Sequence, residues 1–488
     1  MAIPDPTALW DPGSYWLTRL IFRRGLALVY LIAFLVAARQ FRPLAGEEGL
    51  VPLERTIERR SFREAPSLFH LWPDDRVVGI AAWGGVGLSL AALVGLTDRY
   101  GLVVSMASWA VLWALYQSFV NAGRIFYGYG WESMLLETGF LAIFLGPMGV
   151  APPAIVIWLL RWVLFRNMFG AGLIKIRGDP CWRDLSCLDF HYETQPMPNP
   201  LSWHAHHLPK PLHRISVAVN HGVELAVPFL YVAPQPVAAG AGVATIGFQG
   251  WLMLTGNFSW LNFLTIVQAT SLFTDGLLAG VVPVAVPATA ATPLSLQLAA
   301  WTVAGIVALL SVYPVRNLVS SRQVMNTAFD PLHLVNTYGA FGSITRERYE
   351  IVVEGTNDED LTADTDWRPY TFYGKPTDPT RRPPQVAPYH HRLGWQLWFA
   401  AMSPSPRRHP WFLALVDHLL AGDPATRSLV RDDPFPGEPP TYIRARRVRY
   451  RFSTPAERTE AGQWWIREGS HDYVRPVRQG DLDRVGGW

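Results

Sequence analysis

The chain has 488 residues, of which half are hydrophobic, 21 are tryptophan and only 17% are charged. Soluble proteins have about 25% charged residues, so the composition favours a membrane protein with a soluble appendage, and the length favours at least two domains. The net charge of +3 is too small to indicate a nucleic-acid partner, and no helix-turn-helix or zinc-finger spacing supports one. We therefore expect the lipid bilayer, and no nucleic acid, as a partner.

Long apolar segments dominate the first 313 residues. A helix needs about 20 apolar residues to cross a bilayer, and most of these segments reach that length. The first segment is followed by the bulky Phe41 and Arg42, so we interpret it as a retained anchor and not as a cleaved signal. We predict eight or nine membrane spans. The candidate segments are residues 20–38, 77–97, 101–121, 131–150, 153–174, 215–233, 236–254, 258–274 and 293–313.

The chain changes character after Tyr313, because charge and proline increase and no later segment is apolar enough to span a membrane. Short alternating segments in this part predict strands. We predict a polytopic α-helical membrane domain at residues 1–320, followed by a soluble, strand-rich α+β domain at residues 321–488. The predicted strands are residues 349–354, 367–373, 442–452 and 463–467, and the predicted helices are residues 393–402 and 411–421.

The predicted strand at residues 442–452 carries five arginines. Alternation along a strand places Arg447, Arg449 and Arg451 on one face. We interpret this face as a solvated strand surface; a glycan or nucleic-acid patch is the alternative.

Four charged side chains fall inside two predicted spans. Glu132 and Glu137 belong to the fourth segment, and Arg161 and Arg166 belong to the fifth. A hairpin folded at the turn of residues 146–153 would place Glu137 beside Arg161 and Glu132 beside Arg166. Charged groups inside a membrane need partners or a wet cavity, so we predict two interhelical ion pairs, with a functional cavity as the alternative.

Both cysteines of the chain, Cys181 and Cys187, lie in a polar loop at residues 175–214. Their C-x5-C spacing differs from the C-x-x-C of thioredoxin-type redox motifs. We predict a structural disulfide. Two free thiols at the bilayer surface and an exchanging disulfide linked to a client are the alternatives, and exchange would require an accessible thiolate.

A second group of polar residues surrounds the sixth predicted span. Asn220 and Glu224 share a helix face that His221 borders. Imidazoles and a carboxylate suit zinc, but the spacing matches no familiar ligand motif, so we expect no metal and predict hydrogen bonds to loop carbonyls instead. The histidines upstream of this face are His204, His206, His207 and His213.

Several stretches, in order along residues 120–470, resemble the lipase maturation factor family. The run that contains both cysteines carries the clearest resemblance. The quoted stretches are YGWESMLLETGFLAIFLGP (129–147), GLIKIRGDPCWRDLSCLDFHYETQPMPNPLSW (172–203), LTGNFSWLNFLTIV (254–267), VNTYGAFGSIT (335–345), PYHHRLGWQLWFAAM (388–402) and YIRARRVRYRFS (442–453).

The resemblance implies a multi-pass membrane protein that helps secreted lipases, its client proteins, to reach their folded state. It implies a location in the endoplasmic reticulum membrane of a eukaryote, or the plasma membrane of a bacterium, and no cofactor. A count of Lys and Arg would place the cysteine loop and the C-terminal domain in the cytoplasm. The family places them in the lumenal or extracytoplasmic space, and we follow the family because a cysteine pair suits that compartment.

A more distant resemblance offers an enzyme as the alternative. Gly172, Lys175 and Trp182 are similar to a stretch in the membrane domain of vitamin K-dependent γ-carboxylase, which implies that Lys175 would be a catalytic base. We favour a Lys175 that snorkels to the membrane interface or pairs with Asp179 or Asp184. No phosphate loop, dinucleotide fingerprint or G-x-S-x-G elbow is present, and no internal repeat indicates a transporter. We therefore predict a non-catalytic folding factor.

Overall fold

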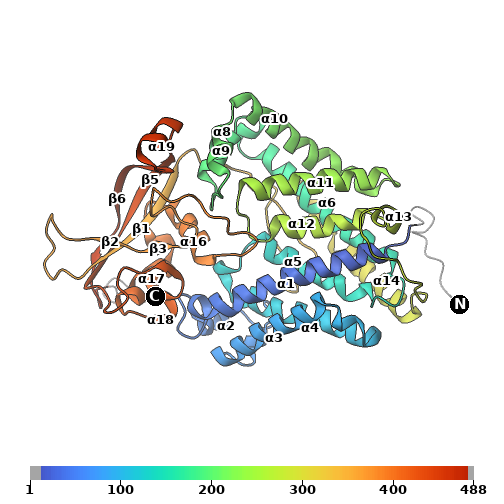
Figure 1. Ribbon diagram of the computed structural model, residues 1–488. Helices are drawn as coiled ribbons and strands as arrows, with labels where there is room; N and C mark the ends of the chain where they lie inside the picture. The colour runs from blue at the N-terminus through green and yellow to red at the C-terminus, as the bar shows by residue number, and fades with distance from the viewer. Residues whose placement is uncertain (1–12, 482–488) are drawn as a thin grey trace.

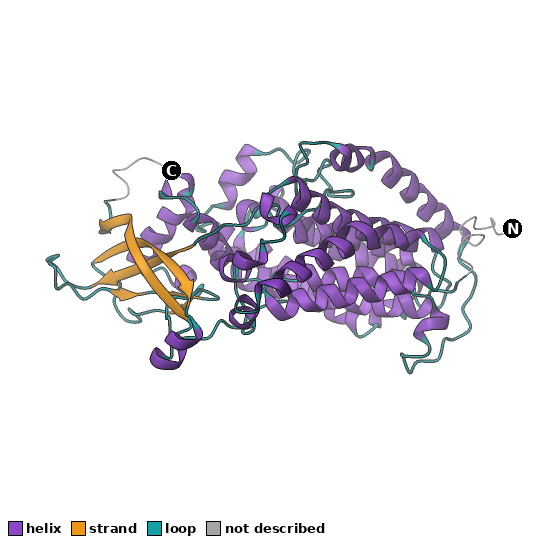
Figure 2. Ribbon diagram, turned by 90° about the horizontal axis from the view of Figure 1, so that it is seen from above, coloured by secondary structure: helices purple, strands orange, loops and turns teal. Residues whose placement is uncertain are grey.

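The computed structural model describes residues 13–481, so the outer ends of the two predicted domains, residues 1–12 and 482–488, lie outside the described residues. A bundle of long helices forms one part of the molecule, and a small twisted sheet with short helices forms the other (Figure 1). Viewed from above, the strands all lie at one end of the elongated molecule (Figure 2). The predicted fold class, a helical membrane domain followed by a strand-containing domain, is confirmed.

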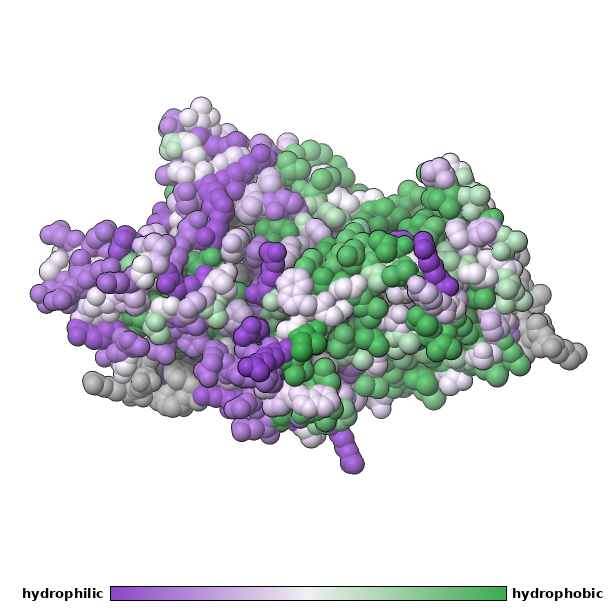
Figure 3. Space-filling view, turned by 60° about the horizontal axis from the view of Figure 1, so that its bottom comes forward, coloured by the Kyte–Doolittle hydropathy of each residue, from purple (hydrophilic) through white to green (hydrophobic). Residues whose placement is uncertain are grey.

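Among residues 13–481, seven helices are long and apolar enough to cross a membrane. Their outward side chains are apolar: Ile80, Val103 and Leu309 are between 73% and 79% exposed. Figure 3 shows this apolar surface over the helical part and a hydrophilic surface over the C-terminal part. Both observations indicate that the chain is a multi-pass membrane protein. The seven helices are Trp16–Ala45 (α1), Asp75–Leu93 (α3), Gly101–Ala122 (α4), Ala154–Arg177 (α6), Lys210–Val232 (α10 and the turns that continue it), Val237–Thr255 (α11) and Leu294–Val319 (α14 and α15).

The remaining two predicted spans form shorter helices inside the bundle. They are Gly130–Ala142 (α5) and Leu261–Ala269 (α12), each continued by one 3-10 turn. The consecutive residues Met134, Leu135 and Leu136 of α5 are all fully buried, so protein surrounds this helix on every side. Each of the nine predicted segments is therefore helical, and seven of them have the length of a span.

The C-terminal domain is built on a four-stranded antiparallel sheet with the strand order β2-β1-β5-β6. The predicted strand at residues 442–452 coincides with β5. The predicted helices correspond to α16 and α17. The elements of this domain are β1 (Arg348–Thr356), β2 (Arg368–Pro369), β3 (Thr371–Phe372), α16 (Arg392–Ala401), α17 (Pro410–Leu420), α18 (Pro424–Arg427), β4 (Val430–Asp432), β5 (Tyr442–Phe452), α19 (Pro455–Ala461) and β6 (Trp465–Val477).

The arginines of β5 have partners in and around the sheet. Arg451 lies 2.7 Å from both Glu457 and Glu468, and Arg449 lies 3.1 Å from Glu347. Arg447 instead stacks on the ring of Tyr349 at 3.4 Å. Acidic side chains thus neutralise Arg449 and Arg451, whereas Arg447 lies on a neutral ring, and of the three only Arg449 is exposed.

A buried ion pair joins the membrane domain to the C-terminal domain. Glu132 of α5 accepts a hydrogen bond of 2.7 Å from Arg392 of α16 and another from the hydroxyl of Tyr116. Both charged side chains are fully buried. Gln40 of α1 reinforces the junction by donating to the carbonyl of His390 at 2.8 Å.

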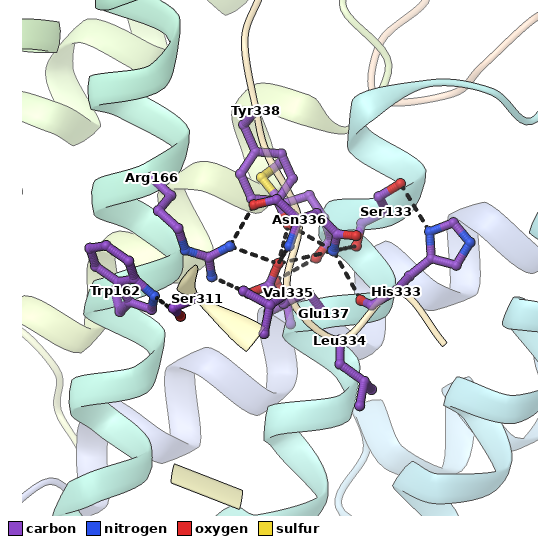
Figure 4. Close-up of polar contacts among 12 residues, drawn as sticks. Ser133, Glu137, Trp162, Arg166, Ser311, His333, Leu334, Val335, Asn336 and Tyr338 are labelled. Carbon is purple, nitrogen blue, oxygen red and sulfur yellow. Dashed lines mark hydrogen bonds and ion pairs between the residues drawn. The ribbon is translucent and has the colours of Figure 1, made fainter. Parts of the chain in front are cut away.

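A second buried cluster lies around Glu137 (Figure 4). Arg166 of α6 forms an ion pair with Glu137. The backbone amide of Asn336 donates to the same carboxylate at 3.0 Å, and the hydroxyl of Tyr338 donates to it at 2.6 Å. Asn336 and Tyr338 belong to the segment that connects the two domains, so this segment is anchored inside the bundle.

The predicted register of the ion pairs is therefore wrong. Glu137 pairs with Arg166 instead of Arg161, and Glu132 pairs with Arg392 instead of Arg166. Arg161 donates to the carbonyl of Ser271 and the hydroxyl of Tyr15, both at 2.9 Å. The predicted register requires an ideal hairpin of two α-helices. In the structure α5 ends at Ala142, and a 3-10 turn and an irregular segment precede α6. The partner of Glu132 also comes from a part of the chain that a local hairpin does not include.

Replacement of Arg392 by Gln should lower the free energy of unfolding by about 3–5 kcal/mol, because it leaves the carboxylate of Glu132 buried without its counter-charge. The double variant Glu132→Gln/Arg392→Gln should recover part of this loss. Arg449→Gln, which alters a half-exposed pair, is the control and should cost less than about 1 kcal/mol. Equilibrium unfolding in detergent micelles measures all three, and equal stability of Arg392→Gln and Arg449→Gln would contradict the role of this pair.

Candidate functional site

The cysteine loop lies at the end of the bundle that faces the sheet (Figure 1). It contains three short helices, α7 (Pro180–Arg183), α8 (Leu188–Thr194) and α9 (Ser202–His206). The Cα atoms of Cys181 and Cys187 are 4.7 Å apart, and their sulfur atoms lie at disulfide distance. Both side chains are buried. Because exchange requires an accessible thiolate, this burial favours a structural disulfide over an exchanging one.

The chain after the membrane domain holds the cysteine loop in place. The indole of Trp182 donates to the carbonyl of Phe341 at 2.8 Å. Asp179 forms a 2.8 Å ion pair with Arg346, and its carboxylate also caps α7 by accepting from the amide of Cys181. The loop is thus fixed from outside as well as by its cysteines.

Arg348 of β1 ties the sheet to the end of this loop. Its guanidinium donates to the carbonyls of Glu193 at 2.9 Å, Gln195 at 2.6 Å and Pro196 at 3.3 Å. It also pairs with Glu350, whose other oxygen lies 2.7 Å from Lys375. We call these contacts of Arg348 the carbonyl clamp. A buried guanidinium with several acceptors fixes orientation better than a single hydrogen bond does.

Lys175 points into the bundle, and the prediction that it snorkels to the interface is wrong. Its ammonium lies 2.6 and 2.8 Å from the two carboxylate oxygens of Glu224 and 3.1 Å from the amide oxygen of Asn220. Its side chain is only 6% exposed, and the ring of Trp182 covers it at 5.1 Å. The predicted acidic partner Asp179 is bound to Arg346 instead.

The local backbone explains this pairing. Helix α10 (Lys210–His221) continues into one π-helical turn, Gly222–Ala226, that contains Glu224. Such turns shift the side chains that follow them and are frequent at functional sites. Gly172 permits the close approach of α6, because a Cβ there would lie 3.0 Å from the Cβ of Glu224. Lys175 lies one turn further along the same face of α6 and so meets the carboxylate.

Most of the predicted histidine group binds the backbone of the loop. His207 contacts the carbonyl of Trp203 at 2.8 Å, and His221 contacts that of Trp182 at 2.9 Å. His213 contacts the carbonyl of Ala205 and the carboxylate of Asp189, both at 2.9 Å. These contacts use one ring nitrogen each of His207 and His221 and both ring nitrogens of His213.

The other two histidines of this group lie near the sheet. His206 is 3.7 Å from the carboxylate of Glu193. His204 is exposed and lies against the ring of Trp203. Neither side chain belongs to the polar pair formed by Lys175 and Glu224.

Two cavities adjoin the cysteine loop. The larger has a volume of about 450 Å³ and lies between the membrane domain and α16, with Trp131, Trp395 and Trp398 in its lining. The smaller, of about 80 Å³, contains Lys175 and Glu224. Six residues line both cavities: Asn167, His191, Phe258, Leu261, Ala340 and Phe341.

Sequence reasoning missed several residues that build this site. Arg392, Asn336, Tyr338 and Arg348 come from the part of the chain expected to be a separate soluble domain. Three of them lie in stretches whose family resemblance is strong, residues 335–345 and 388–402. An arginine in front of an otherwise apolar helix was the available signal for Arg392.

Two family models match the chain. Residues 17–280 match the lipase maturation factor transmembrane domain, and residues 334–475 match the lipase maturation factor C-terminal domain. The chain is 43% identical to lipase maturation factor 1 of Bos taurus, over 96% of this chain and 90% of that protein. It is 42% identical to lipase maturation factor 1 of Homo sapiens, over 98% and 91%. It is 30% identical to lipase maturation factor 2 of Homo sapiens, over 95% and 83%. No solved structure matches.

The cysteine pair yields a direct chemical prediction. Trypsin cleaves after the exposed Arg183, which separates Cys181 from Cys187, so the two peptides should migrate as one linked species until they are reduced. The Cα separation of 4.7 Å lies in the range of natural disulfides. Removal of the bridge by Cys181→Ser/Cys187→Ser should cost about 2 kcal/mol for so short a loop. Mass spectrometry after alkylation of fresh membranes measures the linkage, and two alkylated thiols without prior reduction would disprove it.

His191 yields a prediction for pH dependence. Burial, and secondarily the charge of Lys175, lowers the pKa of His191 to about 3 from 6.5. Below pH 6.5 the unfolded chain takes up a proton at this histidine that the folded chain does not take up. The contribution of His191 to the free energy of unfolding is therefore complete above pH 6.5 and is lost as the pH falls towards 3. Between pH 7.5 and 5.0 the loss should be about 2 kcal/mol.

His191→Phe should remove this part of the loss and keep the ring stacking on Phe258. Chemical unfolding at the two pH values compares the variant with the wild type. The exposed His204→Phe serves as the control and should behave almost as the wild type does. An equal loss in His191→Phe and in the wild type would contradict the assignment.

Proposed function

The chain belongs to the lipase maturation factor family and is a membrane maturation factor, and we propose that it assists the folding of secreted lipases. The observation that carries this proposal is the match to relatives named lipase maturation factor over almost the whole chain. Because the match includes both domains, the whole protein and not one module corresponds to the family.

We place the cysteine loop and the C-terminal domain in the lumen of the endoplasmic reticulum in a eukaryotic host, or outside the plasma membrane in a bacterial one. The support is chemical, because a disulfide persists in an oxidising compartment. The loop and the sheet share one end of the bundle (Figure 1), so whatever compartment contains one contains the other.

The rigid union of the two domains supports a role in which one composite surface receives the client. The pair of Glu132 with Arg392, the cluster around Glu137 and the carbonyl clamp of Arg348 all bind the C-terminal part to the membrane part. A surface built from two such parts keeps its shape while an unfolded client binds and leaves. We propose that this rigid surface beside the cysteine loop is where lipases are held during folding.

The carboxylase-like alternative gains no support. The matched families and the relatives reported above carry the names of maturation factors. Lys175 is bound to both oxygens of Glu224 and to the amide oxygen of Asn220. Its position beside Glu224 fits a structural ion pair between α6 and the π-helical turn.

The proposal is tested in cells that lack their own maturation factors and produce a secreted lipase. Wild-type protein should restore lipase activity in the medium. Arg348→Gln should lower it several-fold at equal protein level, because it opens the carbonyl clamp and leaves buried carbonyls and Glu350 without their donor. Arg449→Gln, in the same sheet but half exposed, should match the wild type.

A secreted, disulfide-bonded protein that is no lipase serves as the second readout. Its secretion should be the same with and without the maturation factor. If its secretion rises as much as that of the lipase, the client class is wrong and the protein acts on secreted proteins in general. If the wild type restores neither, the maturation role in this cell is refuted.

A further inference from the structure

The two cavities beside the cysteine loop form one candidate ligand site, because six residues line both of them. Natural ligand sites have volumes of about 300–1,000 Å³ and mostly apolar linings with a few polar groups that fix orientation. The larger cavity, at about 450 Å³, is within this range and is lined mostly by aromatic, aliphatic and methionine side chains, with Gln195 and Asn326 among its polar members. An apolar molecule of moderate size therefore fits its chemistry.

Two polar groups in the shared lining have bonding capacity left over. His191 is only 8% exposed, and neither of its ring nitrogens has a hydrogen-bond partner among residues 13–481. Asn167 is equally buried and donates from its amide nitrogen to Thr265 at 2.9 Å, while its amide oxygen has no donor within the described part of the chain. Both side chains line the two cavities, so a molecule in that space can use their free hydrogen-bonding capacity.

The charge balance selects the ligand class. Lys175 is fully compensated by Glu224 and Asn220, so the site offers no free charge to an anionic or cationic headgroup. His191 is neutral because burial lowers its pKa to about 3, and a neutral imidazole offers one donor and one acceptor. Asn167 adds a second acceptor. A hydroxyl group, which both donates and accepts, matches this set, whereas a carboxylate or a phosphocholine does not.

The exposed lining residues show how a ligand can enter. Trp251, on the membrane-spanning α11, lines the smaller cavity and is 42% exposed. Met325 and Met402 line the larger cavity and are 42% and 43% exposed. Trp251 thus lies between the smaller cavity and the exposed surface of α11, and we expect an amphiphile to enter past it from the bilayer.

We propose that the joined cavities bind a neutral lipid with a free hydroxyl group, of the monoacylglycerol type. Its hydroxyl lies at His191 and Asn167, and its acyl chain lies in the aromatic cavity between the membrane domain and α16. The cavities lie beside the proposed client surface, but lipid binding is measured without a client, so its test does not depend on the proposed lipase clients.

The test uses the full-length protein in phosphatidylcholine nanodiscs and a monoacylglycerol with a photoreactive diazirine in its acyl chain. Irradiation followed by peptide mapping should label segments that line the larger cavity. Unlabelled monoacylglycerol should displace the probe at a concentration about tenfold lower than the methyl ester or the fatty acid of the same chain length, because both lack the alcohol hydroxyl. It should also displace the probe at a lower concentration than lysophosphatidylcholine, which keeps a hydroxyl but carries a phosphocholine group that the uncharged site cannot pair.

Three variants localise the binding. His191→Phe keeps an aromatic ring of similar shape but removes both ring nitrogens, and it should weaken labelling about tenfold. Ala340→Phe fills the wall that the cavities share and should abolish labelling. Leu261→Trp fills the same wall from α12 and replaces Ala340→Phe if that variant does not fold. His204→Phe, outside both cavities, should label as the wild type does.

Several results would overturn the proposal. Equal competition by the fatty acid or the lysophosphatidylcholine would refute the neutral hydroxyl headgroup. Wild-type labelling of His191→Phe, in protein whose thermal unfolding shows that it is folded, would refute the role of His191. Labelling that survives both filling variants would show that the probe binds elsewhere. None of these results depends on lipase secretion, which is measured separately.

Discussion

A carboxylate buried inside a membrane protein requires a counter-charge, and here the counter-charge comes from the other domain. Glu132 lies in α5, which is surrounded by protein, and its partner Arg392 opens a helix of the C-terminal domain. Isolation of such a carboxylate would cost several kcal/mol. The membrane domain is therefore electrostatically incomplete without the C-terminal domain, which explains why the two parts meet where they do.

Glu137 and the cysteine loop also depend on hydrogen-bond donors from later parts of the chain. Glu137 gains two of its donors from the connecting segment, through Asn336 and Tyr338. The loop gains its anchor from Arg348, the first residue of β1. The C-terminal part is thus no soluble appendage on a finished bundle. It supplies charges and hydrogen bonds to segments synthesised some 150 to 260 residues earlier, so the final structure forms only when the chain has reached β1 and α16.

The sequence predicted what periodicity and composition determine. The nine apolar segments are all helical, and the predicted strand at residues 442–452 coincides with β5 because its side chains alternate clearly. It did not predict partners that are distant along the chain. The predicted register of the ion pairs is wrong because a 3-10 turn, Ile143–Leu145, follows α5 and makes the hairpin non-ideal, and because Arg392 belongs to another domain. Lys175 was misplaced because its partner, Glu224, sits in a π-helical turn that no sequence pattern revealed.

Two buried histidines differ in whether a cavity adjoins them. This difference, and not burial alone, distinguishes a structural histidine from one in a candidate ligand site. His390 is fully buried, and Trp131, Trp260 and Trp395 enclose its ring at centroid distances of 5.2 to 5.9 Å. Its Nδ1 lies 3.8 Å from Glu132, so the carboxylate faces the ring at close range and the aromatic rings leave no place for a further molecule.

His191 is buried almost as deeply, but it lines both cavities and stacks on Phe258. It therefore borders a space large enough for a ligand, and the nearby Lys175 and Glu224 are paired with each other. A neutral imidazole in that position can neither attract an ion nor satisfy itself within the protein. The partner we propose for it is a neutral group that can donate and accept a hydrogen bond, carried by a molecule apolar enough to occupy an aromatic cavity.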